Sequence, residues 1–355
     1  MTRLFVSAGE ASGDRLAAEL LVEIERRRPT LAARGVVGPR LRARGVEEVA
    51  AAEGLAAVGP WQSLRALPGA IRSMWAVEAA LDERRPDLVI TVDAPAWSLR
   101  LAARARRRGL KVVHWVSPQL WAWRPGRAAA VARAADAVLC LFPFEPALYA
   151  KTGVDAVFVG HPAVDRVRPT ARPGERAPVV ALAPGSRPAE VAALWPILRR
   201  VGASARDRWP DVRLVGLAAP GVRLDGLEGL EICEDVAALR ADVCVACSGT
   251  LTLELAAARI PTVVVYRTDG VTWAIARRLV RIPHIALPNV LAGRLVVPEH
   301  LQTLDPAAIL ADIERLLGAA GDVQRAELEA VCVGLGADAI RRTADVVERY
   351  LPGAS

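Results

Sequence analysis

The sequence predicts an α/β protein of two domains, each built on a parallel β-sheet. Short apolar runs alternate with longer amphipathic stretches along the chain, the pattern of strands and helices in parallel sheets. Several apolar runs stop at turns containing glycine or proline that open a helix. A length of 355 residues, 53% of them hydrophobic, suffices for two domains with separate cores. We therefore expect two Rossmann-like domains.

In the first half, the strand expected at Leu4–Ala8 leads through the turn Gly9–Asp14 into a helix. The apolar side of that helix carries Leu16, Leu20, Leu21 and Ile24. Apolar runs predict further strands at 87–92, 112–116, 137–141 and 157–159. Residues 1–167 form the predicted N-terminal domain, and the segment 168–178, rich in Pro, Arg and Gly, is the predicted linker.

The second half repeats this alternation, and residues 179–335 form the predicted C-terminal domain. Its strands are expected at 179–182, 212–217, 230–233, 243–246 and 262–266. The helix after the first of them is expected to kink or restart at Pro196. Residues 287–293 are expected to form a loop, and the chain is predicted to be helical from Pro306 to Tyr350. The C-terminal helix at 336–355 is expected to pack either on the N-terminal domain or on a partner.

Val179–Glu190 carries the clearest candidate for a ligand site. The apolar strand ends here at Pro184-Gly185, and Ser186 is expected to cap the helix that follows. The free amides and the dipole of a helix start attract anions, and the forked donors of Arg187 fit phosphate oxygens. Two interpretations stand: a phosphate site with Arg187 as its cation, or an ordinary turn in which Arg187 pairs with a nearby acid.

A second turn of the same kind follows the strand at 243–246. Ser248, Gly249 and Thr250 present amides and hydroxyls, and Glu254 lies one turn into the next helix. Its carboxylate could accept two hydrogen bonds from a ribose diol. The alternative for 248–250 is ordinary helix capping. Two such turns in one Rossmann-like domain favour a nucleoside diphosphate as the ligand.

The first domain has polar residues of its own at strand ends. Asp93 directly follows the apolar strand 87–92, and the carboxyl ends of central strands open into the crevice where α/β enzymes bind ligands. It is a candidate general base, with capping of the following helix as the alternative. The turn Gly9–Asp14 lacks the G-x-G-x-x-G spacing of dinucleotide sites. His114 lies inside a strand and is expected to be a core residue.

The stretch 61–81, interrupted by Pro68, has apolar residues at helical spacing. These residues are Leu64, Leu67, Ile71, Met74 and Trp75. Spacing alone favours a stripe packed on the sheet. The alternative is an exposed face that enters a bilayer surface, with Arg65 and Arg72 meeting anionic headgroups.

Composition narrows the function classes. The net charge is +7, but 46 basic residues include only two lysines, and the few aromatic residues show no RNA-binding signature, so we expect no nucleic acid partner. Cys244 and Cys247 lie three apart in a predicted strand and face opposite sides, which argues against a shared metal. The cysteines fit buried hydrophobes in a reducing cytoplasm. No apolar segment of membrane-spanning length and no signal peptide are expected.

Motifs along the chain resemble those of lipid-A-disaccharide synthases. They follow the order found in that family and cover nearly the whole sequence: GEASGD at 9–14, DAP at 93–95, SPQLWAWR at 117–124, FPFE at 142–145, GHP at 160–162, PGSR at 184–187, SGT at 248–250 with Glu254, LPNVLAG at 287–293 and VPEHLQ at 297–302. PGSR or SGT alone would carry little weight, but the collinear set is specific. The sequence departs from the pattern at Val37, where a glycine is usual, and at 57–64, which lacks the usual methionine and acid.

The resemblance implies the GT-B fold, in which two Rossmann-like domains with parallel sheets face each other across a cleft and the C-terminal domain holds UDP. It implies an inverting glycosyltransferase that moves 2,3-diacylglucosamine from its UDP conjugate to 2,3-diacylglucosamine 1-phosphate (lipid X). The products would be the lipid A disaccharide 1-phosphate and UDP. Asp93 would be the base, and Arg187 would stabilise the leaving UDP. The implied substrate-binding residues are Glu10, Ser12, Gly13, Asp14, Ser186, Ser248, Gly249, Thr250, Glu254, Tyr266 and Asn289.

The substrates of this family carry acyl chains, so the resemblance favours membrane contact by the stretch 61–81. It implies a cytoplasmic protein bound peripherally to the inner membrane, with a homodimer left open. We expect no cofactor, and no divalent metal, because no Asp-x-Asp motif lies near the nucleotide turns. The remaining alternatives are another GT-B transferase or epimerase for UDP-sugars, or a UDP-binding protein without activity.

Overall fold

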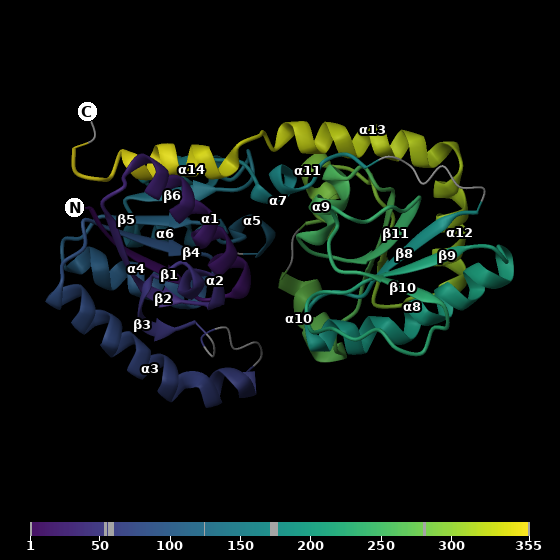
Figure 1. Cartoon of the computed structure of the whole chain (residues 1–355), viewed down its shortest axis with the longest axis horizontal. Coiled ribbons are helices and arrows are strands. Elements are labelled where there is room, and N and C mark those ends of the chain that lie inside the picture. The colour runs from purple at the N-terminus through teal and green to yellow at the C-terminus, as the bar shows by residue number, and fades with distance from the viewer. Residues whose placement is uncertain are drawn as a thin grey trace. The chain divides into compact units, whose positions relative to one another are not determined.

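The computed structural model describes residues 2–52, 55, 60–123, 125–170, 177–279 and 282–353. They form two compact units, unit 1 with Met1–Pro162 and Asp338–Ser355, and unit 2 with Ala163–Ala337. Each unit contains one parallel sheet with helices around it (Figure 1). The predicted α/β class with two Rossmann-like parallel sheets is therefore confirmed.

The sheet of unit 1 has seven strands in the order β3-β2-β1-β4-β5-β6-β7. Its strands are β1 (Thr2–Ala8), β2 (Leu31–Val37), β3 (Glu47–Ala51), β4 (Leu88–Val92), β5 (Val112–Trp115), β6 (Ala137–Cys140) and β7 (Asp155–Phe158). The surrounding helices are α1 (Ala11–Arg27), α2 (Pro39–Ala43), α3 (Pro60–Glu83), α4 (Pro95–Arg107), α5 (Leu120–Trp123), η1 (Pro125–Arg127), α6 (Ala128–Ala134), η2 (Pro146–Tyr149) and α14 (Ala339–Glu348). The strand order reverses direction between β1 and β4, so the crevice of the doubly wound sheet lies at the carboxyl ends of those two strands.

Both faces of this sheet are covered, which is why the central strands β4, β5 and β6 are buried along their whole length. Val6 and Ile90 point to the face that packs on α1 and α14. Phe5 and Val89 point to the opposite face, which α3 and α4 cover. His114 on β5 is fully buried on the second face, where its Nδ1 lies 2.9 Å from the Thr91 hydroxyl. Burial lowers the pKa of His114 to about 4, so it is a neutral core residue, as predicted.

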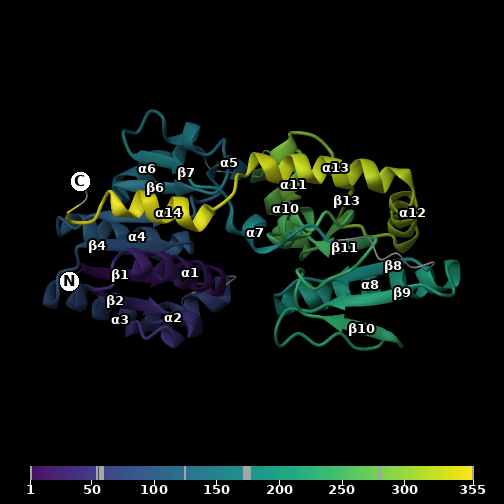
Figure 2. The same cartoon turned by 45° about the horizontal axis from the view of Figure 1, so that its top comes forward.

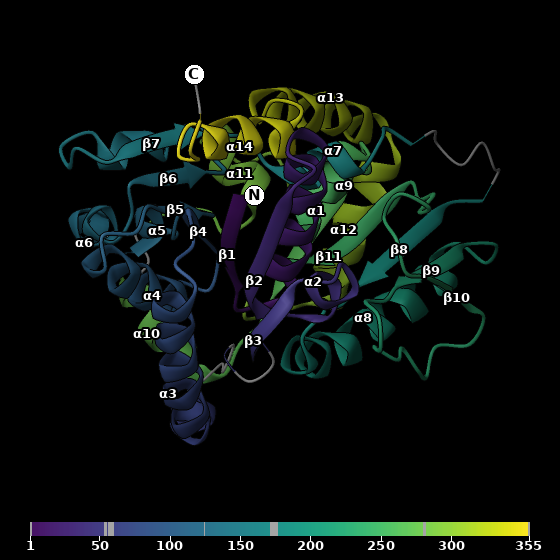
Figure 3. The same cartoon turned by 60° about the vertical axis from the view of Figure 1, so that its left-hand side comes forward.

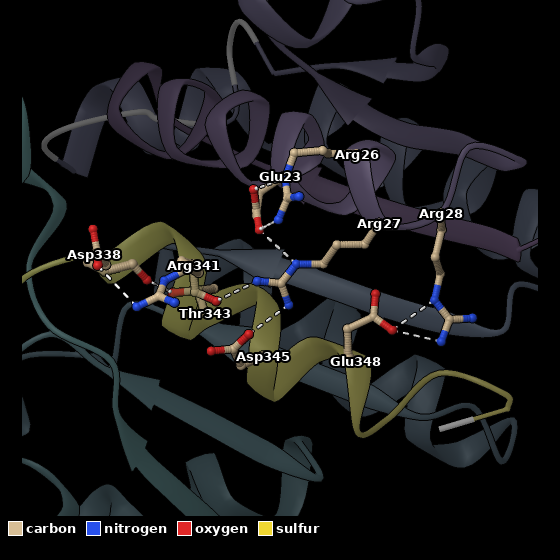
Figure 4. Close-up of polar contacts among 10 residues, drawn as sticks. Glu23, Arg26, Arg27, Arg28, Asp338, Arg341, Thr343, Asp345 and Glu348 are labelled. Carbon is tan, nitrogen blue, oxygen red and sulfur yellow. Dashed lines mark hydrogen bonds and ion pairs between the residues drawn. The ribbon is translucent and has the colours of Figure 1, made fainter. Parts of the chain in front are cut away.

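The C-terminal helix α14 packs on α1 within unit 1, and the two helices lie side by side in Figures 1 and 2. Val346 and Val347 enter the same core as β1 and β4. Figure 4 shows the polar contacts along this junction, where Arg27 donates to Asp345 at 2.7 Å and Arg28 donates to Glu348 at 2.8 Å. The chain thus crosses into unit 2 and returns to complete the core of unit 1.

The sheet of unit 2 has six strands in the order β10-β9-β8-β11-β12-β13. Its strands are β8 (Val179–Ala183), β9 (Arg213–Leu217), β10 (Leu230–Cys233), β11 (Val243–Cys247), β12 (Thr262–Tyr266) and β13 (Glu299–Leu301). Its helices are α7 (Pro162–Arg166), which begins one residue before the unit boundary, α8 (Pro188–Arg208), α9 (Leu251–Ala257), α10 (Gly270–Leu279), α11 (Leu287–Ala292), α12 (Pro306–Leu317) and α13 (Ala319–Gly334). The reversal of strand order falls between β8 and β11. Cys244 and Cys247 lie in the cores on opposite faces of β11, as predicted.

Three local predictions differ from the structure. The helix α3 runs through Pro68 without a break, and α8 continues through Pro196 rather than restarting there. Both helices pack against their sheets over several turns, and this packing offsets the backbone hydrogen bond that a proline removes. The predicted loop at 287–293 is instead the helix α11, ended by Gly293 in the left-handed conformation at φ 66°.

Candidate functional site

In unit 1, three predicted site residues meet where the strand order reverses. Asp93 follows β4, while Ser12 and Gly13 follow β1 at the start of α1. The Ser12 hydroxyl donates to Oδ2 of Asp93 at 3.1 Å. A Cβ atom on Gly13 would lie 3.1 Å from the carbonyl oxygen of Val92, so a glycine lets α1 approach the end of β4 closely. Glu10, half-buried, is the residue immediately before α1.

The backbone at Asp93 has an unusual conformation. Asp93 and Ala94 have positive φ angles of 52° and 44°, which non-glycine residues rarely adopt. The Asp93 amide donates to the carbonyl of Trp115 on the neighbouring strand at 3.0 Å, which fixes the turn. Such strain is concentrated at functional sites, where it holds a side chain in a chosen direction. The half-buried carboxylate is therefore placed at the sheet edge by backbone geometry as well as by its hydrogen bond.

Asp14, predicted to bind substrate, has a structural role instead. It is 2% exposed, and its carboxylate accepts backbone N–H bonds from Gly38 at 3.0 Å, Arg40 at 2.8 Å and Leu41 at 3.2 Å. A Cβ atom on Gly38 would lie 2.6 Å from the carboxyl carbon of Asp14. Asp14 therefore satisfies the orphan amides at the start of α2.

In unit 2, two predicted turns flank the reversal of strand order. Pro184–Arg187 follows β8, and Ser248–Thr250 follows β11. The helix α8 begins at Pro188 with Arg187 as the residue before it, so the prediction that Ser186 caps this helix was wrong. Ser186 is exposed beside it. Gly185 has φ 106°, and a Cβ atom there would lie 2.6 Å from Oε2 of Glu190, so this tight turn requires glycine.

Arg187 pairs with Glu190, which was one of the two interpretations of this turn. Its Nη1 lies 3.1 Å from Oε1 of Glu190, and its backbone N–H donates to Oε2 at 3.3 Å. The Arg187 side chain is still 65% exposed. An exposed ion pair of this kind contributes only about 0–1 kcal/mol. A guanidinium has five N–H donors, so pairing through Nη1 is compatible with binding an anion as well.

The second turn of unit 2 is open in front of its glycine. A Cβ atom on Gly249 would meet no described atom within 4 Å. The Ser248 hydroxyl donates to the carbonyl of Ile285 at 3.1 Å, which orients the turn. Thr250 is exposed just before α9, and Glu254 is half-buried one turn later.

Tyr266 ends β12, the strand next to β11, and is half-buried. Burial raises the pKa of its hydroxyl, and the nearby Cys247 and Glu190 raise it further. Tyr266 is thus a neutral hydrogen-bonding group close to the Arg187–Glu190 pair.

Asn289, predicted to contact substrate, is instead fully buried in a structural network. Its Oδ1 accepts N–H bonds from Val296 at 2.7 Å and Val297 at 2.8 Å. Its Nδ2 donates to the Val297 carbonyl at 2.8 Å and to Glu299 at 2.7 Å. Four hydrogen bonds use the whole capacity of the amide.

Glu299 is a residue for which no role was predicted. Its side chain is 6% exposed and also accepts from the amides of Ile285 and Ala286. In the sequence, only its place in the VPEHLQ motif at 297–302 drew attention to Glu299. Glu299 and Asn289 together hold the segment 285–299 against the sheet.

The apolar residues predicted to contact a membrane, in the stretch 61–81, do not all lie on the surface of unit 1. Within α3, Ile71 is 42% exposed and Trp75 is 67% exposed, whereas Met74 is 6% exposed and packs in the core, so its predicted membrane contact was wrong. The side chains of Leu64 and Leu67 lie outside the described residues. Figure 3 shows α3 along one side of unit 1, next to α4 and β3.

Among the described residues, no three His, Cys, Asp or Glu side chains gather as they would around a metal ion. In the same part of the chain, no helix has both the length and the apolar composition needed to span a bilayer.

Solved structures resemble the whole chain in fold. The calicheamicin glycosyltransferase CalG4 superposes with a TM-score of 0.65 and 18% sequence identity, covering 100% of this chain and 99% of that one. A UDP-GlcNAc 2-epimerase from Neisseria meningitidis, bound to UDP-GlcNAc, has a TM-score of 0.62 at 13% identity, covering 98% and 99%. The predicted GT-B class is thus confirmed at the level of fold.

Sequence comparison is more specific. A family model described as lipid-A-disaccharide synthetase matches residues 4–329. The lipid-A-disaccharide synthase of Anaeromyxobacter dehalogenans strain 2CP-C is 40% identical over 358 residues, which covers 94% of this chain and 93% of that protein. The enzyme of the same name from Geobacter sulfurreducens is 38% identical over 340 residues, covering 89% and 88%. The chain belongs to the lipid-A-disaccharide synthase family.

Proposed function

We propose that this protein transfers 2,3-diacylglucosamine from its UDP conjugate to lipid X, forming the lipid A disaccharide 1-phosphate and UDP. The observation that carries the proposal is the match to lipid-A-disaccharide synthases along nearly the whole chain. The two clusters of polar residues support it, because each lies where its parallel sheet reverses strand order.

In this proposal unit 2 binds the donor. Arg187 and the amides near Ser186 neutralise the diphosphate, and the turn Ser248–Thr250 approaches it closely through Gly249. Glu254 accepts hydrogen bonds from the ribose, and Tyr266 donates from the end of β12. Asn289 acts indirectly, by holding the segment 285–299 to which Ser248 is bonded.

Unit 1 supplies the base and binds the acceptor. An α-linked UDP-sugar that yields a β-bond needs one displacement with inversion. Asp93 takes the proton of the attacking acceptor hydroxyl, and Ser12 orients its carboxylate through the 3.1 Å hydrogen bond. Glu10 lines the acceptor side just before α1, and Gly13 contributes by letting α1 lie close to the end of β4.

The deciding experiment incubates the purified protein with lipid X and UDP-2,3-diacylglucosamine and reads the product by mass spectrometry. A tetraacyl disaccharide 1-phosphate, formed with an equal amount of UDP, is the expected result. UDP-sugar converted to an epimer without disaccharide would favour the epimerase alternative. UDP binding without any turnover would indicate a binding protein.

Replacing Arg187 with alanine should weaken UDP binding about tenfold or more and lower kcat. The reason is that a charge-assisted contact to the diphosphate contributes about 1.5–3 kcal/mol, and Glu190 would lose its cationic partner and keep only the backbone N–H. Calorimetric titration with UDP measures the first effect. The matched variant is Arg187→Lys, which keeps the charge and should lose less. Unchanged UDP affinity in Arg187→Ala would remove this residue from the donor site.

The proposal places the protein on the cytoplasmic face of the inner membrane as a peripheral protein. Ile71 and Trp75 are large apolar side chains exposed on one face of α3, and Arg72, beside this pair, is exposed as well. An apolar pair with a cation beside it suits the boundary of an anionic bilayer.

Replacing Ile71 and Trp75 together with serine should release the protein from vesicles containing anionic lipid, measured by co-sedimentation. The double variant loses the two side chains that would enter the acyl boundary. Ile232→Ser is the matched control, because Ile232 is 54% exposed in unit 2 and should leave sedimentation unchanged. Equal sedimentation of the double variant and the unmodified protein would contradict membrane contact through α3.

A further inference from the structure

Three loops at the carboxyl edge of the unit 1 sheet meet in one aromatic cluster. Trp121 follows β5, Phe142 and Phe144 follow β6, and His161 follows β7. The two phenylalanine rings stack on each other at 5.7 Å, and each meets the Trp121 ring edge-on, at 6.0 and 5.5 Å. His161 stacks on Phe142 at 5.7 Å. The motifs SPQLWAWR, FPFE and GHP are thus joined in space.

Glu145 lies under this cluster and is 1% exposed. Its Oε2 accepts the backbone N–H groups of Leu141 at 2.9 Å and Phe142 at 3.0 Å. Its Oε1 accepts the indole N–H of Trp121 at 3.2 Å. One carboxylate therefore joins the turn after β6 to the helix after β5.

A buried carboxylate is a costly way to make these bonds. Burial raises the pKa of Glu145 to about 7, because its three donors are neutral N–H groups and offset the desolvation only in part. An uncharged side chain at this position would avoid that cost. The carboxylate differs from an uncharged amide in one respect that matters here: both of its oxygens accept, so the turn and the indole are held at the same time.

The held segment adjoins Asp93. Trp115, at the end of β5, accepts the Asp93 N–H at 3.0 Å, and the chain then runs directly into the segment that carries Trp121. Ser117 anchors the same segment, with its hydroxyl 2.9 Å from the Tyr149 hydroxyl. The segment that carries Trp121 thus leaves the sheet from β5, the strand next to β4, which Asp93 follows.

We propose that Glu145 is a positioning residue for the acceptor: by fixing Trp121, it shapes the wall of unit 1 against which the acylated acceptor sugar lies beside Asp93. This inference rests on the proposed function. All the residues involved belong to unit 1, so a change at Glu145 should alter the binding of the acceptor and leave the binding of the donor unchanged.

The test uses Glu145→Gln, Trp121→Phe and the double variant. In Glu145→Gln the single carbonyl can serve the turn, but the amide NH₂ then faces the indole N–H, donor against donor. The KM for lipid X should rise about tenfold, with the affinity for UDP unchanged. Trp121→Phe removes the indole donor and should also raise that KM. In the double variant the donor conflict is absent, so its KM should be no higher than that of Trp121→Phe.

Effects that multiply in the double variant, or Glu145→Gln and Trp121→Phe enzymes with unchanged KM for lipid X, would overturn the inference. A drop in UDP affinity matching the change for lipid X would do the same, because it indicates general damage to the fold. If Glu145→Gln fails to fold, an unchanged KM for lipid X in Trp121→Phe still overturns the inference, because Glu145 is proposed to act through Trp121. The unmodified protein is assayed alongside: its failure to form disaccharide would overturn the proposed function, whereas normal activity with unchanged variants would overturn only the role of Glu145.

Discussion

Asp93→Asn is expected to lower kcat for disaccharide formation by about 10²- to 10⁴-fold, the usual contribution of a general base. Asparagine has the same shape, and its carbonyl oxygen can accept the Ser12 hydroxyl bond that Asp93 accepts at 3.1 Å. The unusual turn at φ 52° also suits asparagine. What the substitution removes is the basic oxygen, so the loss should appear in kcat while UDP affinity stays the same. Initial rates with lipid X and calorimetric titration with UDP measure the two quantities.

Ser12→Ala provides the matched control for Asp93→Asn. It removes the hydrogen bond to the carboxylate and keeps the base, so its loss in kcat should be smaller, about tenfold at most for one neutral hydrogen bond. If Asp93→Asn keeps more than a few per cent of the turnover, Asp93 is not the base. If Ser12→Ala loses as much as Asp93→Asn, the hydrogen bond from Ser12 matters to turnover as much as the basic oxygen of Asp93.

The residues at the carboxyl edge of each sheet could be predicted from the sequence, because a simple rule places them there. The strands β4, β8 and β11 are buried along their whole length and β1 is buried from Leu4 to Ala8, so all four read as mainly apolar runs. A polar residue directly after such a run must lie at the carboxyl edge, whatever the rest of the chain does. Asp93 was found in this way, and Arg187 was found in the turn between β8 and α8. The rule fixes where a residue lies, but it does not say what the side chain binds.

That second question depends on contacts distant in sequence. Asp14 caps a helix that begins 25 residues later, at Pro39, and Glu145 holds an indole 24 residues earlier, at Trp121. Nothing in either motif distinguishes a carboxylate that meets substrate from one that is saturated by backbone amides. The prediction of membrane contact for Met74 was wrong for a related reason. Helical spacing predicts an apolar stripe on α3, but which residues of that stripe are buried depends on the elements that pack against the helix.

Asn289→Ala tests this distinction, because it should destabilise unit 2 strongly rather than weaken a substrate contact. The truncation leaves the buried N–H groups of Val296 and Val297 without their acceptor, and Glu299 loses one of its donors. Each unsatisfied buried group costs about 1–3 kcal/mol, so we expect the free energy of unfolding to fall by about 3–5 kcal/mol. Chemical denaturation measures the loss, and hydrogen exchange at Val296 and Val297 locates it.

A second variant, Asn289→Asp, distinguishes the effect of lost side-chain volume from the effect of an added charge next to Glu299. It keeps the volume and the acceptor for Val296 and Val297, but it replaces the amide that donates to Glu299 at 2.7 Å with a second carboxylate. Two buried carboxylates at that distance repel, so Asn289→Asp should be destabilised at neutral pH and should recover stability as acid protonates one of the pair. Unaltered unfolding in both variants, with weakened binding of the UDP-sugar, would instead return Asn289 to the substrate site.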